Sequence, residues 1–157
     1  MIIAPLRVEL IPQIEQLMAT GEPYITVRSS SDYWMYAQLF SSTCPVALID
    51  NTPTGAIVAF RSQDNPDDIY VQDVVVHPHH RGKGITRQLL ERVRIYGLEH
   101  GCRRIYLTSE PENATAHQTW LTLGFTNIPG DTTHGGVAVI ANFKGPGKDR
   151  AVYELKL

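Results

Sequence analysis

The residues best suited to chemistry gather between Val71 and Leu90, in a stretch that reads VQDVVVHPHHRGKGITRQLL. This stretch has the pattern of an apolar strand, a glycine-rich turn and the start of a helix. Glycines let the backbone adopt positive φ and come close to a ligand. The first amides of a helix have no intrahelical acceptor, and the helix dipole makes that end electropositive. The stretch therefore predicts an anion site suited to a pyrophosphate, with added positive charge from Arg81, Lys83 and Arg87.

Two well-known phosphate loops do not account for this turn. The dinucleotide pattern GxGxxG needs a third glycine at the position of Arg87, and the pattern GxxxxGK followed by Ser or Thr does not occur. A solvated basic helix start would use the same residue types, so the turn alone leaves that interpretation open.

A family resemblance rests on this turn and on a second segment. Arg81-Gly82-Lys83-Gly84-Ile85-Thr86 resembles the acyl-CoA signature of the GNAT superfamily of N-acetyltransferases, which has Gly or Ala where this chain has Thr86. The segment from Asn113 to Phe125 resembles the family's N-x-x-A-x-x-x-Y-x-x-x-G-F pattern, with Trp120 in place of the tyrosine. The stretch from Lys148 to Leu155 resembles the C-terminal strand of the family. The resemblance covers residues 44 to 157.

The resemblance implies a V-shaped cleft that binds acetyl-CoA as a co-substrate, without a metal. The cleft is expected between two strands that splay apart, Val71–Val76 and Arg104–Thr108. The residues expected to bind the co-substrate lie on the first strand, on the glycine turn and on a later helix: Val74, Val75, Val76, Arg81, Gly82, Lys83, Gly84, Ile85, Thr86, Asn113 and Trp120.

The same resemblance implies direct attack by an amine, with no covalent acyl-enzyme. The amide of Val76 is expected to stabilise the oxyanion. Asp73 is the carboxylate nearest the cleft in sequence and the first candidate for general base, with a solvated or salt-bridged Asp73 as an equal alternative; Glu110 is a second candidate. Trp120 stands where the family often has its acid, but an indole N–H does not readily give up its proton. Contact with the pantetheine sulfur and plain core packing are its two interpretations.

The histidines carry weaker signals. His77, His79 and His80 predict a surface loop rather than a metal site, because no carboxylate or thiol is correctly spaced beside them. His117, on a helix, and His134, in a long loop, are each placed where they could approach the cleft.

The acceptor stays open at this point. Asp32, Tyr33, Trp34 and Tyr36 either recognise a small amine or serve as a helix cap and core aromatics, and the run from Tyr36 to Cys44 slightly resembles diaminobutyrate acetyltransferases. We expect acetyl transfer to a primary amine of a small molecule. A protein N-terminal or lysine acetyltransferase and a catalytically degenerate acyl-CoA-binding module are the alternatives. GNAT proteins are often dimers, so the resemblance leaves a homodimer as one option for the oligomeric state.

The elements that must position these residues follow from periodicity. Strands are predicted at residues 2–8, 46–49, 56–60, 69–76 and 104–108, and helices at 11–18, 30–40, 82–100 and 113–123. Turn formers at residues 50–55 predict a hairpin, and a terminal hairpin is expected from 137–143 and 151–157. The order implies an α/β domain. The resemblance implies a GNAT-like fold, with a mixed, mostly antiparallel sheet of about seven strands, splayed between the fourth and fifth, and about four helices.

The overall composition excludes some partners. The 157 residues, 43% of them hydrophobic, fit one domain over residues 1–157. A formal net charge of −2 gives no reason to expect nucleic acid or an anionic membrane as a partner. No signal peptide or membrane span is visible at the start, which favours the cytoplasm. Cys44 and Cys102 lie in no metal spacing and are expected as reduced, buried thiols.

Overall fold

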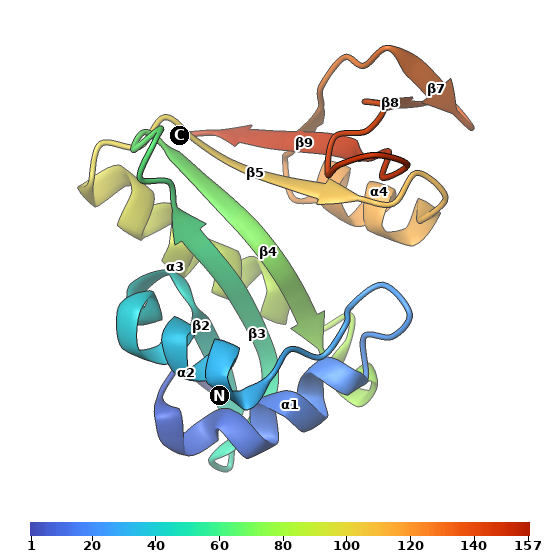
Figure 1. The fold of residues 1–157 in the computed structure, drawn as a ribbon. Helices are drawn as coiled ribbons and strands as arrows, with labels where there is room; N and C mark the ends of the chain where they lie inside the picture. The colour runs from blue at the N-terminus through green and yellow to red at the C-terminus, as the bar shows by residue number, and fades with distance from the viewer.

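A computed structural model describes all residues from Met1 to Leu157 and contains a main sheet of seven strands. The strand order is β1-β2-β3-β4-β5-β9-β6, and every neighbouring pair is antiparallel except β4 and β5. Figure 1 shows this sheet opening between β4 and β5. A separate two-stranded sheet joins β7 and β8. The strands are β1 Ile2–Pro5, β2 Pro45–Ile49, β3 Thr52–Arg61, β4 Asp68–Val76, β5 Arg104–Ser109, β6 Thr126–Asn127, β7 Thr132–His134, β8 Val137–Val139 and β9 Ala151–Lys156.

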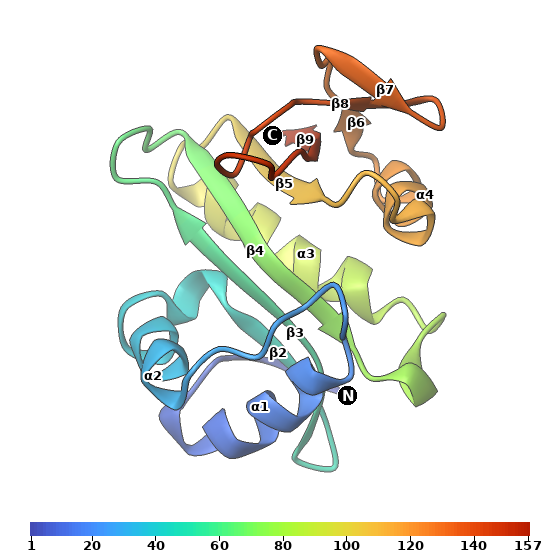
Figure 2. The ribbon, with the colours of Figure 1, turned by 45° about the vertical axis from the view of Figure 1, so that its right-hand side comes forward.

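Four α-helices cover the two faces of the sheet (Figure 2). Helices α1 and α2 pack on one face and α3 on the other, because successive side chains of a strand point to opposite faces. In β3, Ala56 and Val58 contact the α1–α2 core, whereas Ile57 and Ala59 contact the α3 core. The helices are α1 Ile11–Ala19, α2 Ser30–Leu39, α3 Ile85–Glu99 and α4 Ala114–Thr122, with short 3₁₀ helices at Val8–Leu10, Ser41–Thr43 and Pro78–His80. The expected sheet, splay and helices are confirmed.

The first hairpin forms where the turn formers predicted it. Asp50 and Asn51 both have positive φ, 49° and 61°, which is the conformation that a tight turn between two strands requires. β3 is longer than expected, since it starts at Thr52 and continues to Arg61. The hairpin places the middle of β3 beside β4, the strand that carries Asp73.

A bulge in β4 opens the sheet. Val58 pairs with Asp73 and Ala59 with Val71, so Gln72 is an extra residue with no partner in β3. A bulge bends its strand and increases the local twist. On the other side of β4, pairing with β5 runs from Asp68 and Arg104 only as far as Val71 and Leu107. The expected splay between residues 71–76 and 104–108 is confirmed and begins at the bulge.

The bulge also changes which face the side chains of β4 use. Ile69 and Val71 belong to the α3 core, but Val75 belongs to the α1–α2 core. Strict alternation would put all three on one face. Asp73, two residues from Val75 and past the bulge, therefore shares the α1–α2 face.

The C-terminal third differs from the expected hairpin. β8 ends at Val139 and pairs with β7, not with β9, and a single bridge between Ile140 and Arg150 joins the two arms. β9 inserts between β5 and β6 instead. His134 thus lies in β7 rather than in a loop, because the glycines at 135 and 136 make a tight turn with positive φ.

Two further boundaries moved. The first strand ends at Pro5, and the third helix begins at Ile85 rather than at residue 82, because Gly82 and Gly84 both have positive φ. Cys44 and Cys102 are free and buried, and burial raises the pKa of the Cys44 thiol to about 12. None of the helices combines the length and apolar character that crossing a membrane would require.

Candidate active site

A groove of about 1650 Å³ lies in the splay between β4 and β5. Its walls also include the start of α3, α4 and the segment between α1 and α2, which lies beside the C-terminal end of β4 (Figures 1 and 2). Of the residues predicted for the site, Lys83 is exposed and outside this lining. The others line the groove together: Asp73, Val74, Val75, Val76, Arg81, Gly82, Gly84, Ile85, Thr86, Asn113 and Trp120.

The backbone amides of Val74 and Val76 are directed away from β3. His77 N–H donates to the Thr54 carbonyl at 2.8 Å. In an antiparallel pair, residues alternate between those that bond across the pair and those that do not. Val76, which pairs with Gly55, and Val74 therefore direct their amides to the other side, where β5 has already diverged. The Val76 carbonyl on that side accepts from Arg81 Nε at 3.1 Å. The Val76 amide faces the groove, as its expected role requires.

The turn before α3 leaves open space for an anion. Gly82 and Gly84 have φ of +73° and +76°, and a Cβ on either would meet no atom within 4 Å. The backbone bond from Gln88 N to the Gly84 carbonyl closes the first turn of α3. The amides of Ile85, Thr86 and Arg87 precede that bond, so they have no intrahelical acceptor. This arrangement fits the pyrophosphate of acetyl-CoA.

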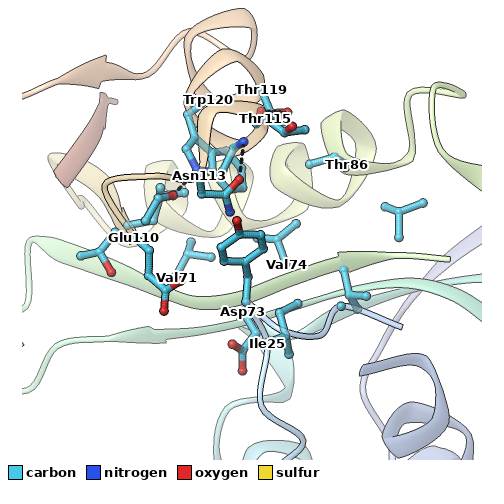
Figure 3. A pocket seen from close by; sticks show the side chains of 18 of the residues that line it. Ile25, Val71, Asp73, Val74, Thr86, Glu110, Asn113, Thr115, Thr119 and Trp120 are labelled. Carbon is cyan, nitrogen blue, oxygen red and sulfur yellow. Dashed lines mark hydrogen bonds between the residues drawn. The ribbon is translucent and has the colours of Figure 1, made fainter. Parts of the chain in front are cut away.

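Helix α4 forms the opposite wall. Figure 3 shows Thr115 and Thr119 of α4 across the groove from Thr86 of α3. Asn113 caps α4 by accepting from the Ala116 amide at 3.1 Å. The predicted role of Asn113 in co-substrate binding stays a prediction, since its side-chain oxygen is already used by this cap. His117 bonds the buried Tyr153 hydroxyl at 2.7 Å and does not line the groove.

Trp120 combines both of its interpretations. Its ring packs edge-on against Phe125 in the α3 core, and it also lines the groove. Its Nε1–H donates to the Ser109 hydroxyl at 2.9 Å, joining α4 to the last residue of β5. Sequence reasoning missed Ser109, because no local pattern marks it.

Asp73 lies on the α1–α2 side of the groove, where Arg28 meets it. The guanidinium of Arg28 is 3.6 Å from Asp73 Oδ2, and the Asp73 side chain is 5% exposed. This is a loose pair: Asp73 Oδ2 and Arg28 Nε are both buried without a hydrogen-bond partner. Burial raises the pKa of Asp73, and the positive charges of Arg28 and Lys144 oppose that shift only in part.

Arg28 and Lys144 are held by other contacts. The Arg28 amide donates to the Tyr33 hydroxyl at 3.1 Å, and the Lys144 ammonium lies 5.2 Å from the centroid of the Tyr70 ring. Both residues were missed from the sequence, because each belongs to a connecting segment without a motif. Glu110 follows β5 on the opposite wall from Asp73 and is half-buried (Figure 3).

The polar-aromatic cluster of α2 is structural. Ser29 and Asp32 form a reciprocal capping box at the start of the helix. Tyr33 and Tyr36 are buried in the α1–α2 core, and neither they nor Trp34 line the groove. Cap and core is confirmed for Asp32, Tyr33 and Tyr36, whereas Trp34 is 50% exposed and belongs to neither the core nor the groove lining.

The arrangement of strand, turn and helix matches a known family. The model of the Acetyltransferase (GNAT) family matches residues 12–125. The chain belongs to the GNAT family. The match includes the splayed strands, the glycine turn and α4, so the groove of this GNAT protein lies almost entirely within it.

Individual relatives share less than a third of their residues with this chain in the aligned segments. A segment of 96 residues, 61% of this chain, is 27% identical to half of an L-2,4-diaminobutyric acid acetyltransferase from Nocardia farcinica. A segment of 62 residues, 40% of the chain, is 29% identical to 43% of an aminoglycoside N(6')-acetyltransferase type 1 from Salmonella typhimurium. The chain thus aligns with half or less of the length of these two relatives.

The fold of this GNAT protein recurs in solved structures. Diaminobutyrate acetyltransferase EctA from Paenibacillus lautus, in complex with L-2,4-diaminobutyric acid and coenzyme A, superposes with a TM-score of 0.79 over 99% of this chain and 93% of that one, at 21% identity. Ard1 from Thermoplasma volcanium superposes with a TM-score of 0.78 at 13% identity. Both likenesses show the fold.

Proposed function

We propose that this protein transfers an acetyl group from acetyl-CoA directly to a primary amine of a small molecule that also carries a carboxylate. The observation that carries the proposal is the loose pair of Arg28 and Asp73 in the wall of the groove. The relatives named for L-2,4-diaminobutyric acid support the same class of acceptor.

The co-substrate enters from the α3 and α4 side. The open turn at Gly82 and Gly84 holds the pyrophosphate, and the groove-facing amides of β4 receive the thioester arm. The Val76 amide donates to the thioester carbonyl oxygen, and the interaction strengthens as negative charge develops there. Much of the rate comes from holding amine and thioester in one groove.

Asp73 acts as the general base on the acceptor side. An ammonium group must lose a proton before it can attack, and a base works best when its pKa is not far below the working pH. The raised pKa of Asp73 fits that requirement better than an ordinary surface carboxyl does. The neutral amine then attacks the carbonyl carbon, the C–S bond breaks, and the thiolate takes a proton as CoA leaves.

Arg28 selects acceptors that carry a carboxylate. A guanidinium that is fully hydrogen-bonded to a carboxylate of its own protein has few donors left for a ligand. Here the distance from Arg28 to Asp73 is long, and Arg28 Nε has no acceptor, so donors remain. An acceptor with both charges satisfies both residues, its ammonium on Asp73 and its carboxylate on Arg28. A cationic peptide would find less charge complementarity beside Asp73, because Arg28 and Lys144 both place positive charge near this carboxylate.

Arg28→Gln separates acceptors by their carboxylate. We expect kcat/KM for L-2,4-diaminobutyric acid to fall roughly 10- to 100-fold, as for loss of a charged hydrogen bond. The matched acceptor is 1,3-diaminopropane, which has the same two amines without the carboxylate, and its kcat/KM should change far less. Both are measured at a pH high enough that Asp73 is fully deprotonated in both proteins, so that a change in its pKa does not affect the comparison. Equal losses for the two acceptors would show that Arg28 does not read the carboxylate.

Lys144→Met changes the pH dependence of the base. Lys144 stabilises the charged form of Asp73, so its loss raises the pKa of Asp73 further. A higher pKa leaves less of the base deprotonated at low pH, so the acidic limb of the kcat/KM profile moves to higher pH. The acceptor's own titration is the same for both proteins, so the difference reports Asp73. Lys148→Met, at another groove-lining lysine, is the matched control and should move the limb less. A limb that stays in place or moves down contradicts the assignment.

The direct test follows release of free thiol from acetyl-CoA across amino acids, diamines, aminoglycosides and short peptides. Release that depends on an amine with a carboxylate supports the proposal. Preference for peptides would identify a protein acetyltransferase. Thermal stabilisation by CoA without release by any acceptor would identify an acyl-CoA-binding module.

A further inference from the structure

The leaving thiolate needs a partner that Trp120 alone does not supply. An indole N–H can donate a hydrogen bond but does not readily give up its proton. Here that N–H is already committed, because it donates to Ser109 Oγ at 2.9 Å. The group left to face the groove is the hydroxyl of Ser109, which is 8% exposed and lines it.

The Ser109 hydroxyl has one unused donor. A serine hydroxyl offers one O–H donor and two acceptor lone pairs. Its side-chain bond in the structure is the one accepted from Trp120, so the O–H is free to rotate about the Cβ–Oγ bond. A hydroxyl that accepts a hydrogen bond becomes a better donor, because bonds in a chain polarise one another. Trp120 thus orients Ser109 and strengthens it as a donor.

The position of Ser109 in the sheet puts this donor across the splay from the groove-facing amides. Ser109 lies two residues beyond Leu107, the last residue of β5 that pairs with β4. It is anchored on the other side by its pairing with Ala151 of β9. Val74 and Val76 line the opposite wall. A thioester lying between the two strands has its carbonyl toward β4 and its sulfur within the same opening as Ser109.

We infer that Ser109, oriented by Trp120, donates its O–H to the sulfur of the departing CoA and stabilises the thiolate, an inference that rests on the proposed function. When the C–S bond breaks, the electron pair stays on sulfur and the Ser109 hydroxyl bonds the resulting anion. An alkyl hydroxyl is less acidic than a thiol, so Ser109 keeps its proton. The thiolate is then protonated by water, and the proton from the attacking amine leaves through Asp73. Ser109 is a catalytic residue in this step and Trp120 a positioning residue.

The test titrates the thiol of bound CoA, which needs no acceptor. The ultraviolet absorbance of the thiolate, followed against pH, gives the pKa of the thiol in the complex. Ser109 stabilises the anion, so we expect Ser109→Ala to raise this pKa relative to the unaltered protein, and Ser109→Thr, which keeps a hydroxyl, to leave it close. Thermal stabilisation by CoA shows that each variant is folded and loaded. An unchanged thiol pKa in Ser109→Ala overturns the inference.

Single-turnover acetyl transfer provides the second measurement. Loss of a donor to a developing charge costs roughly 10- to 100-fold, and we expect Ser109→Ala to show that loss with the KM for acetyl-CoA nearly unchanged. Trp120→Phe keeps an aromatic ring but removes the N–H, and should cost less than Ser109→Ala. The double variant should lose no more than Ser109→Ala alone, because Trp120 acts through Ser109. Losses that multiply would show that Trp120 acts independently and would overturn the positioning role.

The two proposals fail in different ways. Transfer by the unaltered protein together with no effect of Ser109→Ala on rate or thiol pKa keeps the acetyltransferase and rejects the serine. A thiol pKa that responds to Ser109 in a protein that acetylates no amine keeps the serine–thiolate contact and rejects the proposed function. Absence of CoA binding rejects both.

Discussion

Asp73→Asn is expected to lower kcat/KM for acetylation by roughly 10²- to 10⁴-fold, the range observed when a general base is removed. The amide keeps the size of the side chain but cannot accept the proton of the attacking amine. The loss should be largest where the acceptor is mostly an ammonium and should shrink as the pH approaches the pKa of the amine. Thiol release over a range of pH measures both effects. A loss of less than about tenfold would move the role of base to Glu110 or to water.

The same substitution should stabilise the fold. The pKa of Asp73 is higher in the folded chain than in the unfolded one, so the folded state holds its proton more tightly. The contribution of Asp73 to stability is therefore greatest below the unfolded pKa, about 4, and is lost as pH rises through the folded value. An amide at this position does not titrate, so the variant would have no such loss. We expect the melting temperature of Asp73→Asn to exceed that of the unaltered protein at pH 7, by more than it does at pH 4. A variant that is less stable at pH 7 would show that the pair with Arg28 holds the fold together.

Gly84→Ala is expected to raise the KM for acetyl-CoA roughly 10- to 100-fold, as for loss of one charged hydrogen bond at the pyrophosphate. Gly84 has φ of +76°, and the space in front of its Cα is open. A methyl group there occupies the space through which the anion reaches the first amides of α3. Any L-residue in this conformation also carries strain of about 1–2 kcal/mol. The effect of that strain on the fold must therefore be separated from the effect of the methyl group on binding.

Gly101→Ala is the control for strain. Gly101 follows the other end of α3, has φ of +69°, and likewise has no atom within 4 Å of a Cβ. It lies outside the groove. The two variants should lose similar melting temperature, but only Gly84→Ala should lose affinity for acetyl-CoA, measured by titration calorimetry or by KM. Equal affinities would place the pyrophosphate elsewhere.

The strand, turn and helix around the glycines could be predicted because their signals are local. The apolar run before Pro78, the two glycines and the periodic residues of α3 each act within a few positions of one another. The splay was expected only through the family resemblance. Its cause, the unpaired Gln72, leaves no mark in the sequence, because a bulge is defined by the partner strand.

The side chains that complete the candidate site could not be predicted for a related reason. Arg28 reaches Asp73 across 45 positions, and the bond from Trp120 to Ser109 joins a helix to a strand end. Contacts of this kind depend on how elements pack and not on spacing within either one. The predicted C-terminal hairpin was wrong because closeness in sequence does not fix which strands pair. Two segments with strand character lay near each other in sequence, but each found another partner.

The bulge at Gln72 shapes the groove without deciding which wall carries which group. If Gln72 were deleted, Val71 and Asp73 would become consecutive and would keep their present pairing with Ala59 and Val58. Ordinary alternation would then leave Val71 on the α3 face and Asp73 on the α1–α2 face, and the Val76 amide would still point away from β3. The deletion removes the bend, so one lost codon would narrow the groove while the acceptor wall and the co-substrate wall kept their places.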